Sequence, residues 1–274
     1  MHTQPMVELS DGRSIPQLGF GVWRIPEDET SSVVQQAIAA GYRSIDTAAI
    51  YQNERGVGLA IQESPVDRSE LFITTKLWNE EQGFDTTMRA CTESLRKLQL
   101  DSVDLYLIHW PLPKRDRYLD TWRAFIRLRE EGKAKSIGVS NFTVATLQRL
   151  MDDTGVAPVL NQIELHPRFQ QRELREFHAK HGIATESWSP LGRGAFHDPA
   201  IAAIAEKHGK SPAQIVLRWH LDSGLIVIPK STTPARIREN FDLFGFTLDS
   251  DDMAAIAKLD DPAGRVGSHP DTME

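Results

Sequence analysis

The sequence has very little cysteine: Cys91 is the only one among 274 residues. A single cysteine excludes an intrachain disulfide and a cysteine-based metal site, so we expect Cys91 to be a small buried helix residue. Long apolar runs are also missing, and no stretch approaches the roughly 20 residues that cross a bilayer. Residues Met1–Gly12 lack a basic start followed by an apolar run, which predicts a cytoplasmic protein without a secretion signal.

Strong charge bias is absent as well. The formal net charge is -7, and the acidic residues are scattered along the chain. This pattern argues against nucleic-acid and membrane partners and favours a small-molecule ligand. Hydrophobic residues make up 40% and charged residues 25%, which is typical of a globular enzyme. The length favours one domain over residues 1–274, and we expect this domain to be a monomer.

Short apolar runs alternate with longer amphipathic stretches along the chain. This alternation predicts a parallel sheet with crossover helices, and eight such units favour a closed (β/α)8 TIM barrel. The expected strands are Gly19–Val22, Ser44–Asp46, Leu71–Thr75, Val103–Ile108, Ser136–Val139, Leu160–Ile163, Ala184–Ser187 and Leu225–Ile228. The clearest helical stretches are Ser31–Ala40, Thr86–Leu98, Tyr118–Glu131, Arg172–His181, Pro199–His208 and Ser211–His220.

Two segments lie outside this repeat. Val7–Leu9 and Ser14–Ile15 flank an Asp11-Gly12 turn, which predicts an N-terminal β-hairpin that plugs the bottom of the barrel. The tail after Leu259 is rich in Gly, Pro, Asp and Ser, so we expect a loop. Such a loop either folds over the barrel mouth or extends away from it.

Polar residues recur where the expected strands end. In a barrel, the carboxyl ends of the strands carry the active site. The residues placed there are Asp46, Lys76, His109, Ser140, Asn141, Gln162, Trp188, Ser189, Lys230 and Ser231, with Tyr51 in the loop just after Asp46. Singly, each has an ordinary structural explanation: a rim charge, a hydrogen-bonded histidine or a loop anchor. Together they provide a carboxylate, a lysine, a phenol and an imidazole on adjacent strands.

That combination has a chemical logic. A phenol has a pKa of about 10, and a neighbouring ammonium lowers it. A carboxylate paired with the ammonium keeps it charged and fixed in place. An imidazole nearby can hold a carbonyl oxygen against the phenol by a hydrogen bond. The set therefore predicts protonation of a carbonyl oxygen while a hydride reaches its carbon.

Six segments carry a resemblance to a known family. They are Gly41–Glu54 (GYRSIDTAAIYQNE), Phe72–Trp78 (FITTKLW), Asp104–Pro111 (DLYLIHWP), Ser136–Phe142 (SIGVSNF), Asn161–Pro167 (NQIELHP) and Ile228–Ser231 (IPKS). In this order, the segments resemble the aldo-keto reductases almost end to end. Trp188, where many members carry a tyrosine, and the ending Gly264–Pro270 resemble the bacterial 2,5-diketo-D-gluconic acid reductase branch.

The resemblance implies an NADPH-dependent carbonyl reductase and assigns roles to residues. Asp46, Tyr51, Lys76 and His109 would be the catalytic tetrad, with Tyr51 as the proton donor. The implied cofactor-binding residues are Ser140, Asn141 and Gln162 at the carboxamide, Trp188 under the nicotinamide ring, Ser189 and Leu191 along the pyrophosphate, and Lys230, Ser231, Thr232, Arg236, Glu239 and Asn240 at the adenosine phosphate.

The residues themselves also bear on the cofactor and the substrate. A G-x-G-x-x-G motif after a strand is missing, so a Rossmann-type dinucleotide site is excluded. Lys230, Ser231 and Arg236 follow the last strand, where barrels often bind phosphate, and they suit a dianionic 2'-phosphate; a solvated helix start is the alternative. Trp23, Trp78 and Trp110 fall in rim loops and, with His109, predict an aromatic substrate pocket.

Two other functions stay open at this point. One is a non-catalytic NADP-binding scaffold or regulatory subunit on the same fold. The other is a metal-dependent barrel hydrolase that uses Asp46, His109 and His166. The position of Lys76 disfavours a metal cation beside Asp46, so we expect no metal. The tail residues Arg265 and His269 either steer an anionic substrate or face water.

Overall fold

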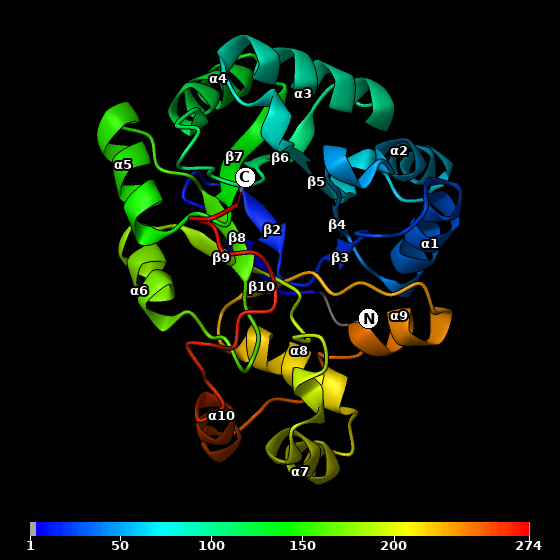
Figure 1. Cartoon of the computed structure of the whole chain (residues 1–274). Helices are drawn as coiled ribbons and strands as arrows, with labels where there is room; N and C mark the ends of the chain where they lie inside the picture. Colours follow the sequence, from blue (N-terminus) through cyan, green and yellow to red (C-terminus); the bar gives the residue numbers. More distant parts are fainter. Residues whose placement is uncertain (1–3, 274) are drawn as a thin grey trace.

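The computed structural model describes residues 4–273. The main sheet contains β3 (Phe20–Gly21), β4 (Ser44–Asp46), β5 (Phe72–Leu77), β6 (Val103–Ile108), β7 (Ala134–Ser140), β8 (Leu160–Glu164), β9 (Ala184–Trp188) and β10 (Ile226–Val227). These strands pair in parallel in sequence order. The sheet closes on itself, because Val227 bridges Leu18 and accepts a 2.8 Å hydrogen bond from the Gly19 N–H. The predicted (β/α)8 barrel is confirmed (Figure 1).

Helices surround the barrel (Figure 1). They are α1 (Glu27–Ala40), α2 (Glu54–Glu63), α3 (Phe84–Leu98), α4 (Tyr118–Glu130), α5 (Val144–Thr154), α6 (Arg172–Lys180), α7 (Pro199–His208), α8 (Pro212–Asp222), α9 (Pro234–Phe241) and α10 (Ser250–Ala257). Short 3-10 turns are η1 (Ala49–Tyr51), η2 (Arg68–Glu70), η3 (Asn79–Glu81) and η4 (Ala195–His197). In the described part of the chain, every helix is too short or too polar to cross a membrane.

Local sequence explains where these helices begin. Ser211 caps α8 in a capping box with Gln214, and Pro212 occupies the first turn, where its missing N–H costs nothing. α1 begins at Glu27, four residues before the predicted start. Its first turn contains Glu27, Asp28 and Glu29, and these carboxylates interact favourably with the positive end of the helix dipole.

Successive side chains along a strand point to opposite faces of the sheet, and this divides the core into two parts. Within β6, Tyr106 and Ile108 pack outward in the large cluster beneath the helices. Leu105 and Leu107 instead point into the barrel, where they share a smaller cluster with Leu9 and Ile15. Such alternation is the period of a strand that is buried on both faces.

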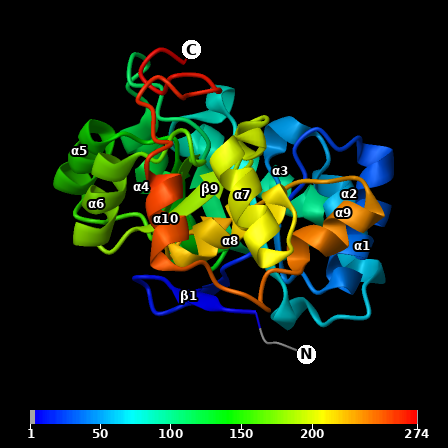
Figure 2. The ribbon, with the colours of Figure 1, turned by 90° about the horizontal axis from the view of Figure 1, so that it is seen from below.

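The hairpin residues of this inner cluster come from β1 (Met6–Glu8), β2 (Ser14–Pro16) and the turn between them. The two strands pair antiparallel, as the Asp11-Gly12 turn predicts. Figure 2 shows the hairpin at one end of the barrel and the C-terminal segment at the other. The hairpin therefore covers the bottom of the barrel and leaves the carboxyl ends of the strands for the site.

Candidate active site

A cavity of about 480 Å³ opens at the carboxyl ends of the barrel strands. Side chains from most of the strands reach it, because parallel strands deliver their ends to one rim. The predicted site residues that line it are Trp23, Asp46, Tyr51, Trp78, His109, Trp110, Ser140, Asn141, Gln162, Trp188, Ser189 and Lys230. Residues far apart in the sequence are thus brought to one place, with the volume of a small-molecule site.

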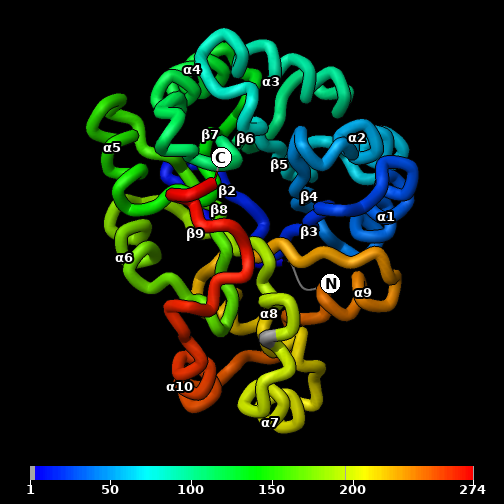
Figure 3. The backbone as a smooth tube through the Cα atoms, viewed as in Figure 1, coloured from blue at the N-terminus to red at the C-terminus, as the bar shows by residue number. Residues whose placement is uncertain are grey.

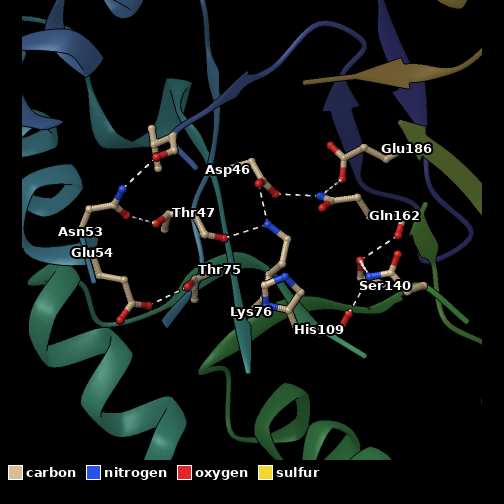
Figure 4. Close-up of polar contacts among 12 residues, drawn as sticks. Asp46, Thr47, Asn53, Glu54, Thr75, Lys76, His109, Ser140, Gln162 and Glu186 are labelled. Carbon is tan, nitrogen blue, oxygen red and sulfur yellow. Dashed lines mark hydrogen bonds and ion pairs between the residues drawn. The ribbon is translucent and has the colours of Figure 1, made fainter. Parts of the chain in front are cut away.

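Lys76 lies at the centre of the polar residues below this cavity, at the end of β5. Its ammonium donates to Asp46 Oδ1 at 2.5 Å and to the Thr47 carbonyl at 2.9 Å (Figure 4). The Lys76 side chain is fully buried, and Asp46 is 2% exposed. A buried ammonium needs such partners, because an unpaired charge in the interior is very costly.

Tyr51 lies next to this ion pair, in the turn η1. The Lys76 ammonium is 5.2 Å from the centre of the Tyr51 ring. Burial raises the pKa of the Tyr51 phenol, Lys76 opposes that rise, and Asp46 adds to it. Because the balance is upward, Tyr51 keeps its proton at neutral pH and can donate a hydrogen bond.

Lys76 itself stays charged. Burial alone would lower the pKa of Lys76, but the charge and hydrogen bond of Asp46, together with Tyr51 and Glu186, outweigh the burial and raise it above the ordinary value. The ion pair is therefore maintained at neutral pH, and a positive charge stays beside the phenol.

His109 completes the predicted tetrad beside Tyr51. The two ring centres are 5.7 Å apart, and Trp78 packs edge-on against His109 at 5.2 Å. Burial, with a contribution from Lys76, holds the pKa of His109 well below its ordinary value. The imidazole is therefore neutral, with one N–H to donate and one nitrogen to accept.

Glu186 is a component of the site that the strand-end pattern did not single out. It is 1% exposed and faces Gln162 across the β8–β9 pair. The Gln162 amide nitrogen donates to Glu186 Oε2 at 2.7 Å and to Asp46 Oδ2 at 2.8 Å (Figure 4). Burial, reinforced by Asp46, raises the pKa of Glu186 to about 8. The signal in the sequence was its position two residues before Trp188, on the same face of the strand.

The residues predicted for the nicotinamide side form a hydrogen-bonded chain. The Trp188 indole N–H donates to Asn141 Oδ1 at 2.8 Å, and Asn141 Nδ2 donates to the His109 carbonyl at 3.0 Å. Ser140 Oγ donates to the Gln162 carbonyl at 2.7 Å. These bonds fix the indole of Trp188, a flat surface suited to stacking at the cavity wall.

The residues predicted for the phosphate side lie at and after the end of the last strand. Lys230 lines the cavity, and Ser231 is buried, with its Oγ accepting from the Thr233 N–H at 3.1 Å. Exposed Thr232 precedes α9, and exposed Arg236 lies in its first turn, whereas Glu239 and Asn240 follow later in the helix. Thr233 makes no side-chain cap, so the first N–H groups of α9 are open to an anion. Leu191 is half-buried beyond the cavity-lining Ser189.

The three rim tryptophans differ in exposure. Trp110 is 8% exposed and Trp23 is 39% exposed, with Trp78 between them. The guanidinium of Arg24 lies 4.3 Å above the Trp23 ring and lines the cavity with it. The walls are therefore aromatic, and Arg24 adds a cation at the rim.

The set considered for a metal-dependent hydrolase is not assembled. His166 pairs with Glu164 at 3.1 Å, whereas Asp46 is paired with Lys76. Within residues 4–273, no group of three His, Cys, Asp or Glu side chains could hold a metal ion.

The C-terminal segment folds over the barrel mouth (Figure 3). Its residues Gly267, Ser268 and Met273 line the cavity. Arg265 lies 4.6 Å above the Phe169 ring, and neither Arg265 nor His269 is among the cavity-lining residues. Of the two possibilities left open for the tail, the structure therefore has the folded one.

Comparisons with known proteins agree with this geometry. The profile of the Aldo/keto reductase family matches residues 17–261. Methylglyoxal reductase DkgA of Yersinia pestis is 57% identical over 274 residues, which cover 99% of this chain and 98% of the relative. An aldo/keto reductase structure from Brucella melitensis is 62% identical, with a TM-score of 0.93 over 95% of this chain and 99% of that one.

A variant of Gox0644 has been solved in complex with NADPH. It is 55% identical to this chain, with a TM-score of 0.96 and full coverage of both chains. The chain belongs to the aldo/keto reductase family and is an oxidoreductase of that family.

Proposed function

We propose that this enzyme reduces small polar dicarbonyl compounds with NADPH, and that Tyr51 gives the proton to the carbonyl oxygen. The observation that carries the proposal is that Tyr51 contacts both Lys76, the partner of Asp46, and neutral His109, at a cavity whose wall includes Trp188. A carbonyl oxygen that sits between the phenol and the imidazole can accept a hydrogen bond from each.

The residues present fit an NADP cofactor. Trp188 gives a flat wall for a nicotinamide ring, and the cavity continues from there to Lys230. The open first turn of α9 with Arg236 suits a phosphate, since helix N-termini and guanidinium groups both bind phosphate oxygens. When bound, reduced nicotinamide supplies the hydride. Complexes of relatives with NADPH and NADP support the same cofactor here.

The chain's own residues would act on the proton. Tyr51 holds it on the phenol oxygen at neutral pH, and the Lys76 ammonium stabilises the phenolate left after transfer. Asp46 fixes that ammonium through its 2.5 Å ion pair. Neutral His109 orients the substrate oxygen and adds no second positive charge next to Lys76.

The cavity favours small polar substrates over bulky apolar ones. The tail residues Ser268 and Met273 partly cover its mouth, and the cations Arg24 and Arg193 line it. Relatives named methylglyoxal reductase DkgA support a small dicarbonyl. The resemblance to the diketogluconate reductase branch supports a keto sugar acid as the other candidate of this class.

A substrate panel tests the proposal. NADPH consumption is followed with methylglyoxal, 2,5-diketogluconate, diacetyl and a bulky apolar ketone, each with and without a chelator. We expect the largest kcat/KM with one of the small dicarbonyls and no effect of the chelator. NADPH binding without turnover would instead indicate a non-catalytic scaffold. A preference for the bulky ketone would contradict the substrate class.

A further inference from the structure

We propose that Glu164 is a positioning residue that holds the C-terminal segment, residues 264–273, across the mouth of the cavity and thereby sets substrate affinity. This inference rests on the proposed function for its kinetic consequence. Its structural half, the anchoring of the segment, stands independently.

The anchor is a buried carboxylate that binds two backbone N–H groups. Glu164 is the last residue of β8 and is 1% exposed. Its Oε1 accepts from the Val266 N–H at 2.6 Å, and its Oε2 accepts from the Gly267 N–H at 2.8 Å. The His166 ring lies 3.1 Å from Oε1. A carboxylate with such partners forms charge-assisted hydrogen bonds, which are stronger than neutral ones.

These contacts keep the anchor charged. Burial alone would raise the pKa of Glu164, but the hydrogen bonds from His166, Val266 and Gly267 outweigh the burial and lower it. At neutral pH the group is therefore a carboxylate with acceptors only, which is the form that backbone N–H donors need.

Gly267 allows the segment to lie directly on the site. A Cβ at this position would collide with the Trp188 ring and would lie 2.9 Å from Glu164 Oε2. The backbone therefore packs against Trp188, the indole that forms a wall of the cavity. Any residue other than glycine would have to push either the indole or the carboxylate away.

A second contact holds the same segment. Arg265 packs over the Phe169 ring at 4.6 Å, and Phe169 exchanges backbone hydrogen bonds with His166. The chain at Arg265 is thus tied to the loop after β8, and Glu164 fixes the residues that follow. Beyond the anchor, Ser268 and Met273 form part of the cavity wall. Release of the anchor would remove this wall and leave Tyr51, Lys76 and His109 unaltered.

Glu164→Gln is the direct test. Glutamine keeps the size of the side chain, but it loses the charge and turns an N–H2 group toward a backbone donor. We expect the amides of Val266 and Gly267 to exchange hydrogen at least about tenfold faster, the scale of one lost charge-assisted bond. KM for methylglyoxal should rise by about the same factor, with kcat within about threefold of the parent enzyme.

Gly267→Ala tests the same contact from the tail and keeps the Glu164 carboxylate in the chain, so its exchange rates test the anchor if Glu164→Gln does not fold. We expect faster exchange at residues 266 and 267, because the added Cβ displaces the segment from Trp188 and Glu164. Glu173→Gln is the matched control, because Glu173 is an exposed carboxylate on α6; neither exchange nor KM should change there.

Two results would overturn the inference. Parent-like exchange at Val266 and Gly267 in both variants would show that Glu164 does not anchor the segment. A fall in kcat at constant KM would place Glu164 in the chemistry instead. If the parent enzyme reduced no carbonyl compound, the proposed function would fail, while the exchange measurement would still decide the anchor.

Discussion

At the residue scale, ionisable side chains lie inside the barrel, and the charge of one depends on the charge of the next. Lys76 has no exposed surface, and its charge depends on Asp46. Removing one partner of such a pair leaves the other charge uncompensated, which costs about 3–5 kcal/mol. The same dependence should appear in the kinetics, because in the proposed mechanism Lys76 acts on the substrate through Tyr51.

Lys76→Met should therefore reduce kcat almost as far as Tyr51→Phe does. The double variant should be little worse than either single one, because groups that act as a unit are strongly non-additive. Steady-state kinetics of the three variants, with circular dichroism as the control for folding, measures this. Multiplicative losses in the double variant would count against a shared role. Lys76→Met with Asp46→Asn removes the unpaired charge if the single variant is unstable.

The buried carboxyl group of Glu186 predicts how the stability of the protein depends on pH. Its pKa is about 8 in the folded protein against an ordinary value of 4.5, so the folded state holds a proton that the unfolded state has released between these values. The stability linked to this group is therefore complete below about pH 4.5 and is lost as pH rises through 8. Relative to Glu186→Gln, the parent enzyme should lose free energy of unfolding from pH 5 to pH 8. Chemical denaturation at each pH measures this. If the free energies of unfolding of the parent enzyme and of Glu186→Gln changed equally from pH 5 to pH 8, the raised pKa of Glu186 would be refuted.

The grouping of the side chains proposed as catalytic was predictable, because each lies at or just after a β-rich run and parallel strands deliver their ends to one rim. Glu186 and Glu164 were not singled out. Glu186 shares a strand face with Trp188, but a strand buried on both faces does not itself show which face lines the cavity. Glu164 also depends on residues about 100 positions later, Val266 and Gly267, and no local pattern encodes that contact.

At the scale of elements, the hairpin and most of the amphipathic helices were predictable, but α2, α5, α9 and α10 were not among the helices named from the sequence. α2 contains Gly56 and Gly58, which weaken a helix in isolation. The structure explains them by close packing: a Cβ at Gly56 would lie 2.8 Å from the Glu27 carbonyl, and one at Gly58 would collide with the Leu98 backbone. Tertiary packing against α1 and α3 thus overrides local propensity.

The start of α9 leads to a prediction about the preference for NADPH over NADH. Arg236 is exposed in the first turn, at the open N–H groups of the helix. Arg236→Ala should weaken NADPH binding at least about tenfold, and more at low salt, because a charge-assisted bond is worth about 1.5–3 kcal/mol. NADH binding should barely change. Calorimetric titration with both cofactors measures this, with Arg238→Ala, an exposed arginine of the same helix, as the control. Equal losses for the two cofactors would show that Arg236 does not contact the 2'-phosphate.

At the scale of the whole molecule, the two ends of the barrel differ: the hairpin closes one end, and the cavity opens at the other. The hairpin packs Leu9 and Ile15 into the bottom, and the C-terminal segment covers part of the top. The barrel and its plug were predictable from strand count and turn chemistry. The path of the tail was not predictable, because a Gly- and Pro-rich segment lacks the hydrophobic periodicity that indicates a helix or a strand. The expectation of a single monomeric domain in the cytoplasm stays a prediction.

The central claim is that Tyr51 is the acid of an NADPH-dependent reductase. The most direct test is Tyr51→Phe, which removes one oxygen and leaves the ring against His109 and Lys76. NADPH affinity should be unchanged, and kcat with methylglyoxal should fall at least about 10²-fold, the usual scale of general acid catalysis. Near-parent turnover by Tyr51→Phe would contradict the account.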